Sequence, residues 1–374
     1  MALSSNTNLK YNRRTDRPHL IIDAGSAKER GAQRATLLGD ELRGGFGAYE
    51  ILFEKAGLSQ HVVRESGLRV IDDIARWRPQ VVEELSGIAQ SGGLELWQVA
   101  ALNARTELLG SASNGLPGEC STLVYAPRQS VVERLTEPFG VQTWDWNEEQ
   151  NDFWHTQYVK GDRFSYVGIT EHGILGKIGV NSGGLALFLN ILAHEGDGVG
   201  GIPVHILAAR VLEEAGSVRE AIELLRQVKL HSSTTLTLAD AHEVVSVELS
   251  PVGIFEISPI DGYLLHTNHF LANGEKLREK PLYRPDTYNR FDLVSQRLKV
   301  YGRPNSHEQL LEFLYSDPDQ AHLCCLPDFG AELGKRWRTL TTIVLDPVRM
   351  TANILDGSPV EQRARTWLTL SAAA

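Results

Sequence analysis

The chain has 374 residues, of which 42% are hydrophobic and 22% charged, and its formal net charge is −10. This is the composition of an ordinary globular protein with a substantial core. The acidic balance disfavours nucleic acid or an anionic membrane surface as the main partner. No apolar run approaches the roughly 20 residues of a membrane-spanning helix, and residues 1–7 do not have the pattern of a secretory signal. With three cysteines, two of them adjacent, we expect reduced thiols and a cytoplasmic protein.

The predicted elements fall into helical and strand-rich blocks. Residues 18–24 predict a strand, and residues 26–109 carry apolar side chains at helical spacing. After Cys120 the pattern becomes β-rich, with helices expected at 204–227, 288–301 and 306–315. The expected strands are 121–125, 139–146, 164–170, 185–192, 244–249, 253–257, 263–267, 340–345 and 350–355. The absence of a linker or repeat, together with this order, predicts one α+β domain with sheets flanked by helices.

Cys120 stands at the boundary between the two patterns, in the run Gly118–Tyr125. A cysteine there is either a small buried hydrophobe that opens a core strand or a nucleophile presented at a strand start. The only other cysteines, Cys324 and Cys325, do not settle the choice and are best interpreted as buried thiols beside a loop.

Three other patterns have a bearing on chemistry. Residues 196–201 match G-x-G-x-x-G, but a second helix follows where a dinucleotide-binding unit needs a parallel strand, so a flexible loop is favoured. His266 and His269 do not have a metal-ligand spacing, and we expect neither metal nor cofactor. Arg105 and Glu107 form either a helix-end ion pair or a buried polar anchor for the loop before Cys120.

Five strings in order resemble the acyl-coenzyme A:6-aminopenicillanic acid acyltransferase family of N-terminal nucleophile hydrolases. They are 102–107, 119–122, 142–146, 181–185 and 266–271, and the resemblance runs from about residue 20 to 355. It implies a four-layer αββα fold made as an inactive precursor. It also implies self-cleavage between Glu119 and Cys120 into an α chain of 1–119 and a β chain of 120–374, held together as a heterodimer. A higher oligomer stays open.

The resemblance further implies roles for individual residues. Asn268 is expected to donate a side-chain N–H to the oxyanion, Asp145 to support the nucleophile or the self-cleavage, and Thr122 to bond near the cleaved peptide. Arg336 matches an active-site arginine by its distance from Asp346. Two assignments stay open: Arg338 as the alternative to Arg336, and which serine of the pair Ser232–Ser233 is functional.

The chemistry explains why the cysteine must begin the new chain. The ordinary pKa values of a thiol and an α-amine, about 8.5 and about 7.7–8.0, are both close to neutrality. The free amine of Cys120 can therefore take the thiol proton and return it to the leaving group. No separate histidine base is required.

The leading hypothesis is an amidohydrolase that cleaves an N-acyl amide of a small amine or amino acid through an S-acyl-Cys120 intermediate. The first alternative is an acyltransferase that passes the acyl group of an amide or a coenzyme A thioester to an amine. The alternative of another class is a non-enzymatic binding protein in which Cys120 stays a buried thiol in mid-chain.

Overall fold

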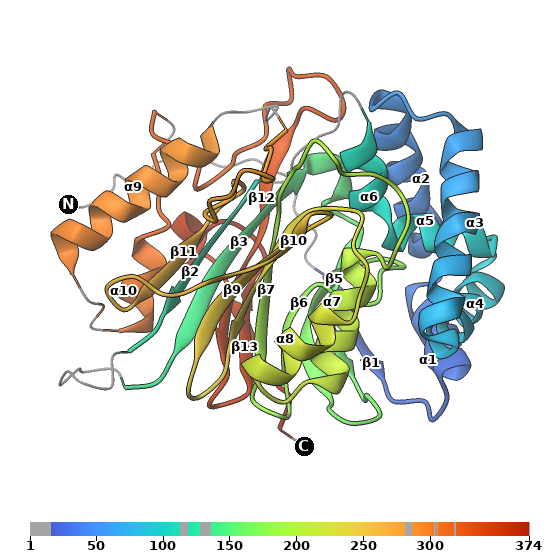
Figure 1. The fold of residues 1–374 in the computed structure, drawn as a ribbon, viewed down its shortest axis with the longest axis horizontal. Coiled ribbons are helices and arrows are strands. Elements are labelled where there is room, and N and C mark those ends of the chain that lie inside the picture. Colours follow the sequence, from blue (N-terminus) through green and yellow to red (C-terminus); the bar gives the residue numbers. More distant parts are fainter. Residues whose placement is uncertain are drawn as a thin grey trace.

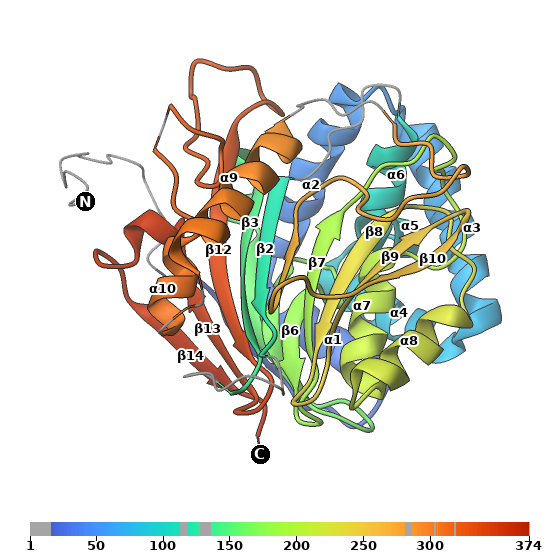
Figure 2. The ribbon, with the colours of Figure 1, turned by 60° about the vertical axis from the view of Figure 1, so that its left-hand side comes forward.

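The computed structural model describes residues 16–112, 119–127, 136–280, 286–302, 304, 306–317 and 319–373, with the side chain of Glu119 left out. Two β-sheets pack face to face, and helices cover both outer faces (Figures 1 and 2). The helices are α1 (Ala27–Leu38), α2 (Asp40–Lys55), α3 (Gln60–Trp77), α4 (Pro79–Gly92), α5 (Leu96–Asn103), α6 (Arg105–Ser111), α7 (Val204–Glu214), α8 (Val218–Arg226), α9 (Asp286–Tyr301) and α10 (His307–Glu312), with short 3-10 turns η1 (Glu148–Gln150) and η2 (Pro359–Glu361). The strands are β1 (His19–Ile22), β2 (Glu119–Tyr125), β3 (Phe139–Asn147), β4 (Trp154–Val159), β5 (Tyr166–Glu171), β6 (Ile178–Asn181), β7 (Ala186–Ile191), β8 (Thr234–Ala239), β9 (Val244–Ser250), β10 (Gly253–Ile257), β11 (Tyr263–His266), β12 (Trp337–Asp346), β13 (Thr351–Leu355) and β14 (Trp367–Ser371).

The eight-stranded sheet has the order β1-β4-β5-β6-β7-β8-β9-β10, and the six-stranded sheet has the order β11-β2-β3-β12-β13-β14. Strand β1 pairs with β4 in parallel, while β2 pairs antiparallel with both β11 and β3. Helices α1 to α8 lie outside the larger sheet, and α9 and α10 (orange and red-orange in Figure 2) lie outside the smaller one. The chain thus forms a four-layer αββα sandwich.

The first helices are set by local signals. Ser26 and Glu29 form a capping box at the start of α1, and Pro79 occupies the first position of α4. Helices α1 and α4 then approach closely at two glycines, because a Cβ on Gly31 would lie 1.9 Å from the Glu84 carbonyl oxygen. Gly87 is in the mirrored position, where a Cβ would lie 2.1 Å from the Lys28 carbonyl oxygen. The backbones of α1 and α4 can therefore come this close only because both positions are glycines.

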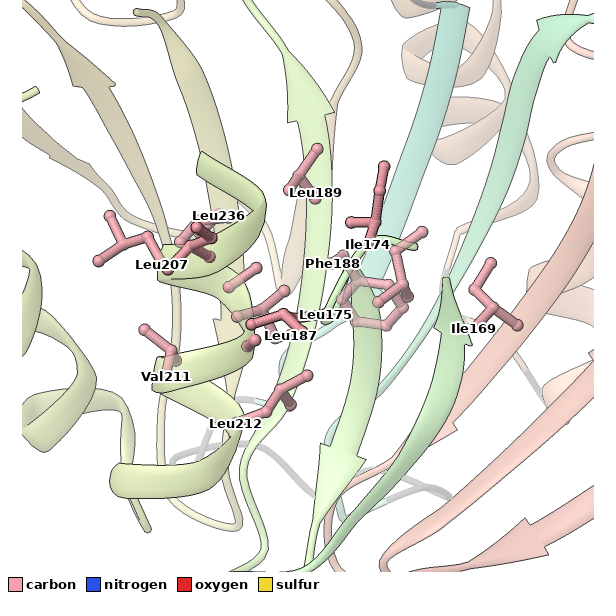
Figure 3. Close-up of a cluster of buried hydrophobic side chains, with 14 of the residues drawn as sticks. Ile169, Ile174, Leu175, Leu187, Phe188, Leu189, Leu207, Val211, Leu212 and Leu236 are labelled. Carbon is pink, nitrogen blue, oxygen red and sulfur yellow. The ribbon is translucent and has the colours of Figure 1, made fainter. Parts of the chain in front are cut away.

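The inner strands join the helix layer and the second sheet. In Figure 3, Leu187 of β7 lies beside Val211 and Leu212 of α7, and Phe188 lies on the other face of β7. That alternation is the ordinary two-residue period of a strand. The Phe188 ring reaches Gly140 of β3, where a Cβ would lie 2.7 Å from its ring. Strand β7 thus contacts the helix layer with one face and the second sheet with the other.

The predicted α+β sandwich is confirmed. Strands β4, β6, β8 and β14 were missed, because the first three carry buried polar side chains that blur a β pattern and β14 is a partly exposed strand at the end of its sheet. The single helix expected at 204–227 is two helices. The side chain of Ser217 accepts a hydrogen bond from Glu220 N and starts α8 as a new helix. No helix in the described part of the chain is long and apolar enough to cross a membrane.

The glycine contact between α1 and α4 can be tested by adding one carbon. We expect Gly31→Ala to lower the free energy of unfolding by about 3 kcal/mol, because the new Cβ meets backbone atoms of α4 that can move only together with the helix. The matched control is Gly47→Ala in α2, where nothing lies within 4 Å of the added Cβ. The control should stabilise the protein by about 0.5–1 kcal/mol through helix propensity. Urea unfolding followed by circular dichroism measures both, and equal effects would contradict the close packing.

Candidate functional site

Strand β2 is the second strand of the smaller sheet, between β11 and β3, and it places Cys120 directly opposite Trp144 of β3. Successive side chains of β2 point to opposite faces. Ser121 accepts a hydrogen bond from Arg290 of α9, on the outer side, whereas Thr122 bonds to Asn190 of β7, on the inner side. Cys120 shares the face of Thr122, so its thiol points into the space between the two sheets.

The backbone of Cys120 is held from both ends of the residue. Its N–H donates to Asn268 Oδ1 at 2.9 Å. Its carbonyl oxygen accepts from Asn190 Nδ2 at 2.9 Å and from Arg290 Nη1 at 3.0 Å. The Asn268 amide is itself fixed, since Oδ1 also accepts from Arg290 Nη2 at 2.9 Å and Nδ2 donates to the Ile191 carbonyl at 2.9 Å. This is a charge-assisted network of buried groups.

The Cys120 thiol lies in a buried environment, with the residue only 3% exposed. Burial, helped by the negative charge of Asp145, raises the pKa of the thiol to about 11. The positive charges of Lys177 and Arg290 and a hydrogen bond to the Asp145 backbone act in the opposite direction and favour the thiolate. In the continuous chain the thiol is therefore protonated at neutral pH.

Asp145 stands directly opposite Glu119, the residue before the cysteine, across the β2–β3 pair. Its carboxylate accepts hydrogen bonds from Thr143 at 3.1 Å and from Thr339 of β12. The hydroxyl of Thr339 in turn accepts the Cys325 N–H at 2.8 Å. The predicted residues Asp145 and Asn268 thus both lie beside Cys120, one through its position on β3 and the other through a direct hydrogen bond.

Thr122 also lies at this site. Its hydroxyl donates to Asn190 Oδ1 at 2.6 Å, and the same amide donates to the Cys120 carbonyl. The contact reaches the peptide that follows Cys120, rather than the Glu119–Cys120 peptide to which the prediction referred.

The two candidate arginines have other partners. Arg336 Nε donates to the Ala331 carbonyl at 2.9 Å, and its guanidinium lies 6.0 Å from the centre of the Phe329 ring. Arg338 is buried and pairs with Glu148 at 2.7 Å. None of these contacts joins either arginine to Cys120, Asn268 or Asp145. The arginine that touches Cys120 is Arg290, which sequence reasoning missed.

The strings before and after Cys120 meet in a buried polar cluster. Arg105 does not pair with Glu107 but forms two 2.7 Å hydrogen bonds to Glu171. Glu107 instead accepts from Ser232 at 2.8 Å and from the Val204 N–H at 2.9 Å. Both residues are therefore buried polar groups rather than a helix-end ion pair, while the loop before Cys120 that they were expected to anchor lies outside the described residues. Of the serine pair, Ser232 bonds to this glutamate and Ser233 bonds to Asp197 at 2.7 Å.

The remaining motifs have structural partners. His266 bonds to Glu248 and to the Thr267 carbonyl, both at 2.9 Å, and His269 bonds to Thr267 and Thr287. The glycine-rich segment 196–201 is the loop between β7 and α7, and the next strand, β8, pairs antiparallel with β7. A dinucleotide-binding unit would require a parallel strand there.

Asn190 and Arg290, which bond to the Cys120 backbone, were not found by the sequence analysis. Asn190 had a usable signal, because it is an amide near the end of the otherwise apolar strand β7 and buried polar side chains need partners. Arg290 had none, since it is one of several charged residues in the ordinary amphipathic pattern of α9.

The role of Arg290 in holding the site together can be measured. We expect Arg290→Met, made in a Cys120→Ala background, to lower the free energy of unfolding by about 3–5 kcal/mol. The substitution removes three buried hydrogen bonds and leaves their acceptors in place. The control is Arg297→Met on the same helix, whose guanidinium forms only partly buried hydrogen bonds, to the carbonyls of Phe313 and Tyr315. Urea unfolding of both variants should show the larger loss at Arg290.

Comparison with known proteins finds matches both by sequence profile and by whole-chain similarity. Residues 133–361 match the family described as acyl-coenzyme A:6-aminopenicillanic acid acyl-transferase. The chain is 29% identical over 301 residues to the acyl-coenzyme A:6-aminopenicillanic-acid-acyltransferase 40 kDa form of Emericella nidulans, which covers 79% of this chain and 80% of that protein.

Solved structures with a similar fold are more distant. The Caenorhabditis elegans N-acylethanolamine-hydrolyzing acid amidase ortholog is 17% identical, with a TM-score of 0.41 over 61% of this chain and 93% of its own. A variant of the conjugated bile acid hydrolase of Clostridium perfringens is 12% identical, with a TM-score of 0.45 over 68% of this chain and 94% of its own. The family assignment rests on the sequence match, which spans more than half of the chain and includes Asp145 and Asn268. The chain belongs to the acyl-coenzyme A:6-aminopenicillanic acid acyl-transferase family.

Proposed function

We propose that the protein is a self-processing amidohydrolase with Cys120 as its N-terminal nucleophile. The observation that carries the proposal is the hydrogen bond from the Cys120 nitrogen to Asn268 Oδ1. In the continuous chain this nitrogen is an amide, and after cleavage before Cys120 it becomes an α-amine. The side-chain carbonyl oxygen of Asn268 can accept a hydrogen bond from the amide and from the α-amine. The nitrogen of Cys120 can therefore keep the same partner before and after cleavage.

The proposed self-cleavage conserves all atoms. The Cys120 sulfur forms a bond to the Glu119 carbonyl carbon, the peptide C–N bond breaks, and the nitrogen takes up a proton. Water then hydrolyses the resulting thioester to the Glu119 carboxylate and the free thiol. In each later turnover the α-amine takes the thiol proton, the sulfur takes the acyl group, and the substrate amine leaves with that proton. A second water releases the acid.

Asn268 fits a further role in both reactions. One of its two amide hydrogens is directed to the Ile191 carbonyl, and we propose that the other donates to the oxyanion that develops on the attacked carbonyl. We further propose that Asp145 fixes the strand backbone that bonds to the thiol, and that Thr122 orients Asn190 on the Cys120 carbonyl. The contacts of Arg336 give no support to a catalytic role, which stays a prediction.

Processing would produce two fragments, 1–119 and 120–374. The first contains β1 and helices α1 to α6, and the second contains the remaining elements. Because β1 pairs with β4 inside the larger sheet, we propose that the fragments remain together as a heterodimer.

Self-cleavage can be tested by mass spectrometry of the denatured protein. We expect two fragments that divide between Glu119 and Cys120, and one continuous chain for Cys120→Ala, because alanine has no nucleophile. The control is Cys325→Ala, whose buried thiol bonds to the His322 carbonyl and which should be processed like the original chain. A continuous chain that hydrolyses amides, and keeps this activity as Cys120→Ala, would overturn the proposal. A continuous chain without such activity would favour the binding-protein alternative.

The matching family favours a second candidate, acyl transfer, because the Emericella nidulans relative is an acyltransferase by its description. The same S-acyl-Cys120 intermediate would serve both reactions, so the acceptor decides between them. We propose hydrolysis and expect free acid to be the main product when the processed enzyme is given N-acyl amides in the presence of amine acceptors. Chromatography of the products with and without coenzyme A thioester donors measures the partition. An excess of acylated amine would assign the transferase function instead.

A further inference from the structure

Lys177 is a buried cation beside Cys120 that the chemistry above does not use. Its Nζ lies 2.6 Å from Glu171 Oε1 and 3.6 Å from the centre of the Trp144 ring. Trp144 is the residue directly opposite Cys120 on β3, and the side chains of such a pair lie on the same face of the sheet. The ammonium group therefore lies at an indole ring that shares the inner face of the smaller sheet with the Cys120 thiol.

The charges around Lys177 are unequal. Arg105 and Lys177 both pair with the carboxylate of Glu171, so these three groups carry one excess positive charge when the lysine is protonated. Tyr49 donates a hydrogen bond to the same carboxylate. Burial is the main reason why the pKa of Tyr49 lies well above its ordinary value. Burial also lowers the pKa of His205 well below the ordinary value. Neither group adds charge at neutral pH.

The buried position of Lys177 and the charges around it change the pKa of its amine. Burial lowers the pKa of Lys177 to about 7; the charges of Glu171 and Cys120 oppose this effect and that of Arg105 adds to it. The charged groups that act on the thiol include Asp145, Lys177 and Arg290, and the charge of Arg105 also interacts with it. Near neutral pH the lysine thus exists partly as a neutral amine, which is a base.

Self-cleavage has a chemical requirement that later turnovers do not have. The Cys120 nitrogen is still an amide and cannot take the thiol proton, so the base of the mature enzyme does not yet exist. Arg290 stays protonated at any ordinary pH. His205, which is bonded to Thr106 in the same cluster, has a pKa that burial lowers well below its ordinary value, so it is a poor proton acceptor. Lys177 is the group in this cluster that can change its protonation state near neutral pH.

We propose that Lys177 accepts the Cys120 thiol proton during self-cleavage and so acts as the base of the precursor; this rests on the proposed self-processing. The proton moves from sulfur to Lys177 Nζ while the sulfur bonds to the Glu119 carbonyl carbon. When the C–N bond breaks, the Cys120 nitrogen takes a proton and Lys177 returns to the neutral amine. The new α-amine then replaces Lys177 as the base in each turnover.

The test follows the rate of cleavage of the full chain after cell-free translation, by denaturing mass spectrometry from pH 6 to 9. We expect Lys177→Met and Lys177→Arg to cleave about 100-fold more slowly, the effect of losing a general base. Arginine keeps the positive charge but cannot accept the proton. Tyr49→Phe is the matched control: it removes another hydrogen bond to Glu171 and should cleave within about 3-fold of the original chain.

Two further readouts separate a base from a structural residue. The cleavage rate of the original chain should rise with pH through about 7 and then level off, because the neutral amine of Lys177 is the active form. In Lys177→Met molecules that have been cleaved, the turnover of substrate should fall much less than the cleavage rate does, because the α-amine is then the base.

Four results would contradict the proposal. The first two are a Lys177→Met chain that cleaves within about 3-fold of the original rate and a Lys177→Arg chain that cleaves at the original rate. The third is a loss of turnover in cleaved Lys177→Met molecules as large as the loss in cleavage rate. The fourth is a cleavage rate of the original chain that keeps rising tenfold per pH unit up to pH 9. The pH profile uses the unmodified chain, so it tests the proposal even if the variants do not fold. An original chain that is never cleaved would overturn self-processing as well, whereas a Lys177→Met chain that cleaves within about 3-fold of the original rate overturns the role of Lys177 alone.

Discussion

The burial of Cys120 between two sheets is the constraint on which the rest of the site depends. A thiol in this position is kept neutral by the loss of water around it, so any reaction must bring its own proton acceptor and its own donors for developing charge. The polar groups around Cys120 come from both sheets and from α9. Only the packed sandwich brings them together, since they lie far apart in the sequence.

The same constraint explains why so many charged side chains lie inside this protein. Arg105, Glu171 and Lys177 are all fully buried, and each is stabilised by a partner of opposite charge. Removing such groups from water is costly, and pairing recovers only part of that free energy. A core made for stability alone would use apolar residues at these positions. Their presence near Cys120 is better explained by the electrostatic needs of the thiol, with which the charges of Arg105 and Lys177 interact.

Much of the fold could be predicted from the sequence, and less of the site. The helical and strand-rich blocks follow from apolar periodicity, which is a local property, and most of their positions agree with the structure. Asp145 and Asn268 were found because they stand in short recognisable strings. Asn190, Arg290 and Lys177 come near Cys120 only through the pairing of strands and the packing of α9. Such contacts are set by tertiary structure, and the spacing of residues along the chain does not encode them.

The position of β2 has a consequence for the stability of the protein after cleavage. Strand β2 is hydrogen-bonded on both sides, and β1, from the other side of the proposed cut, completes the edge of the opposite sheet. A cut before Cys120 would therefore release a chain end without releasing either piece. Separation of the pieces would require opening the common core, so dilution would not dissociate them. The two chains would melt in one transition, as a single cooperative unit.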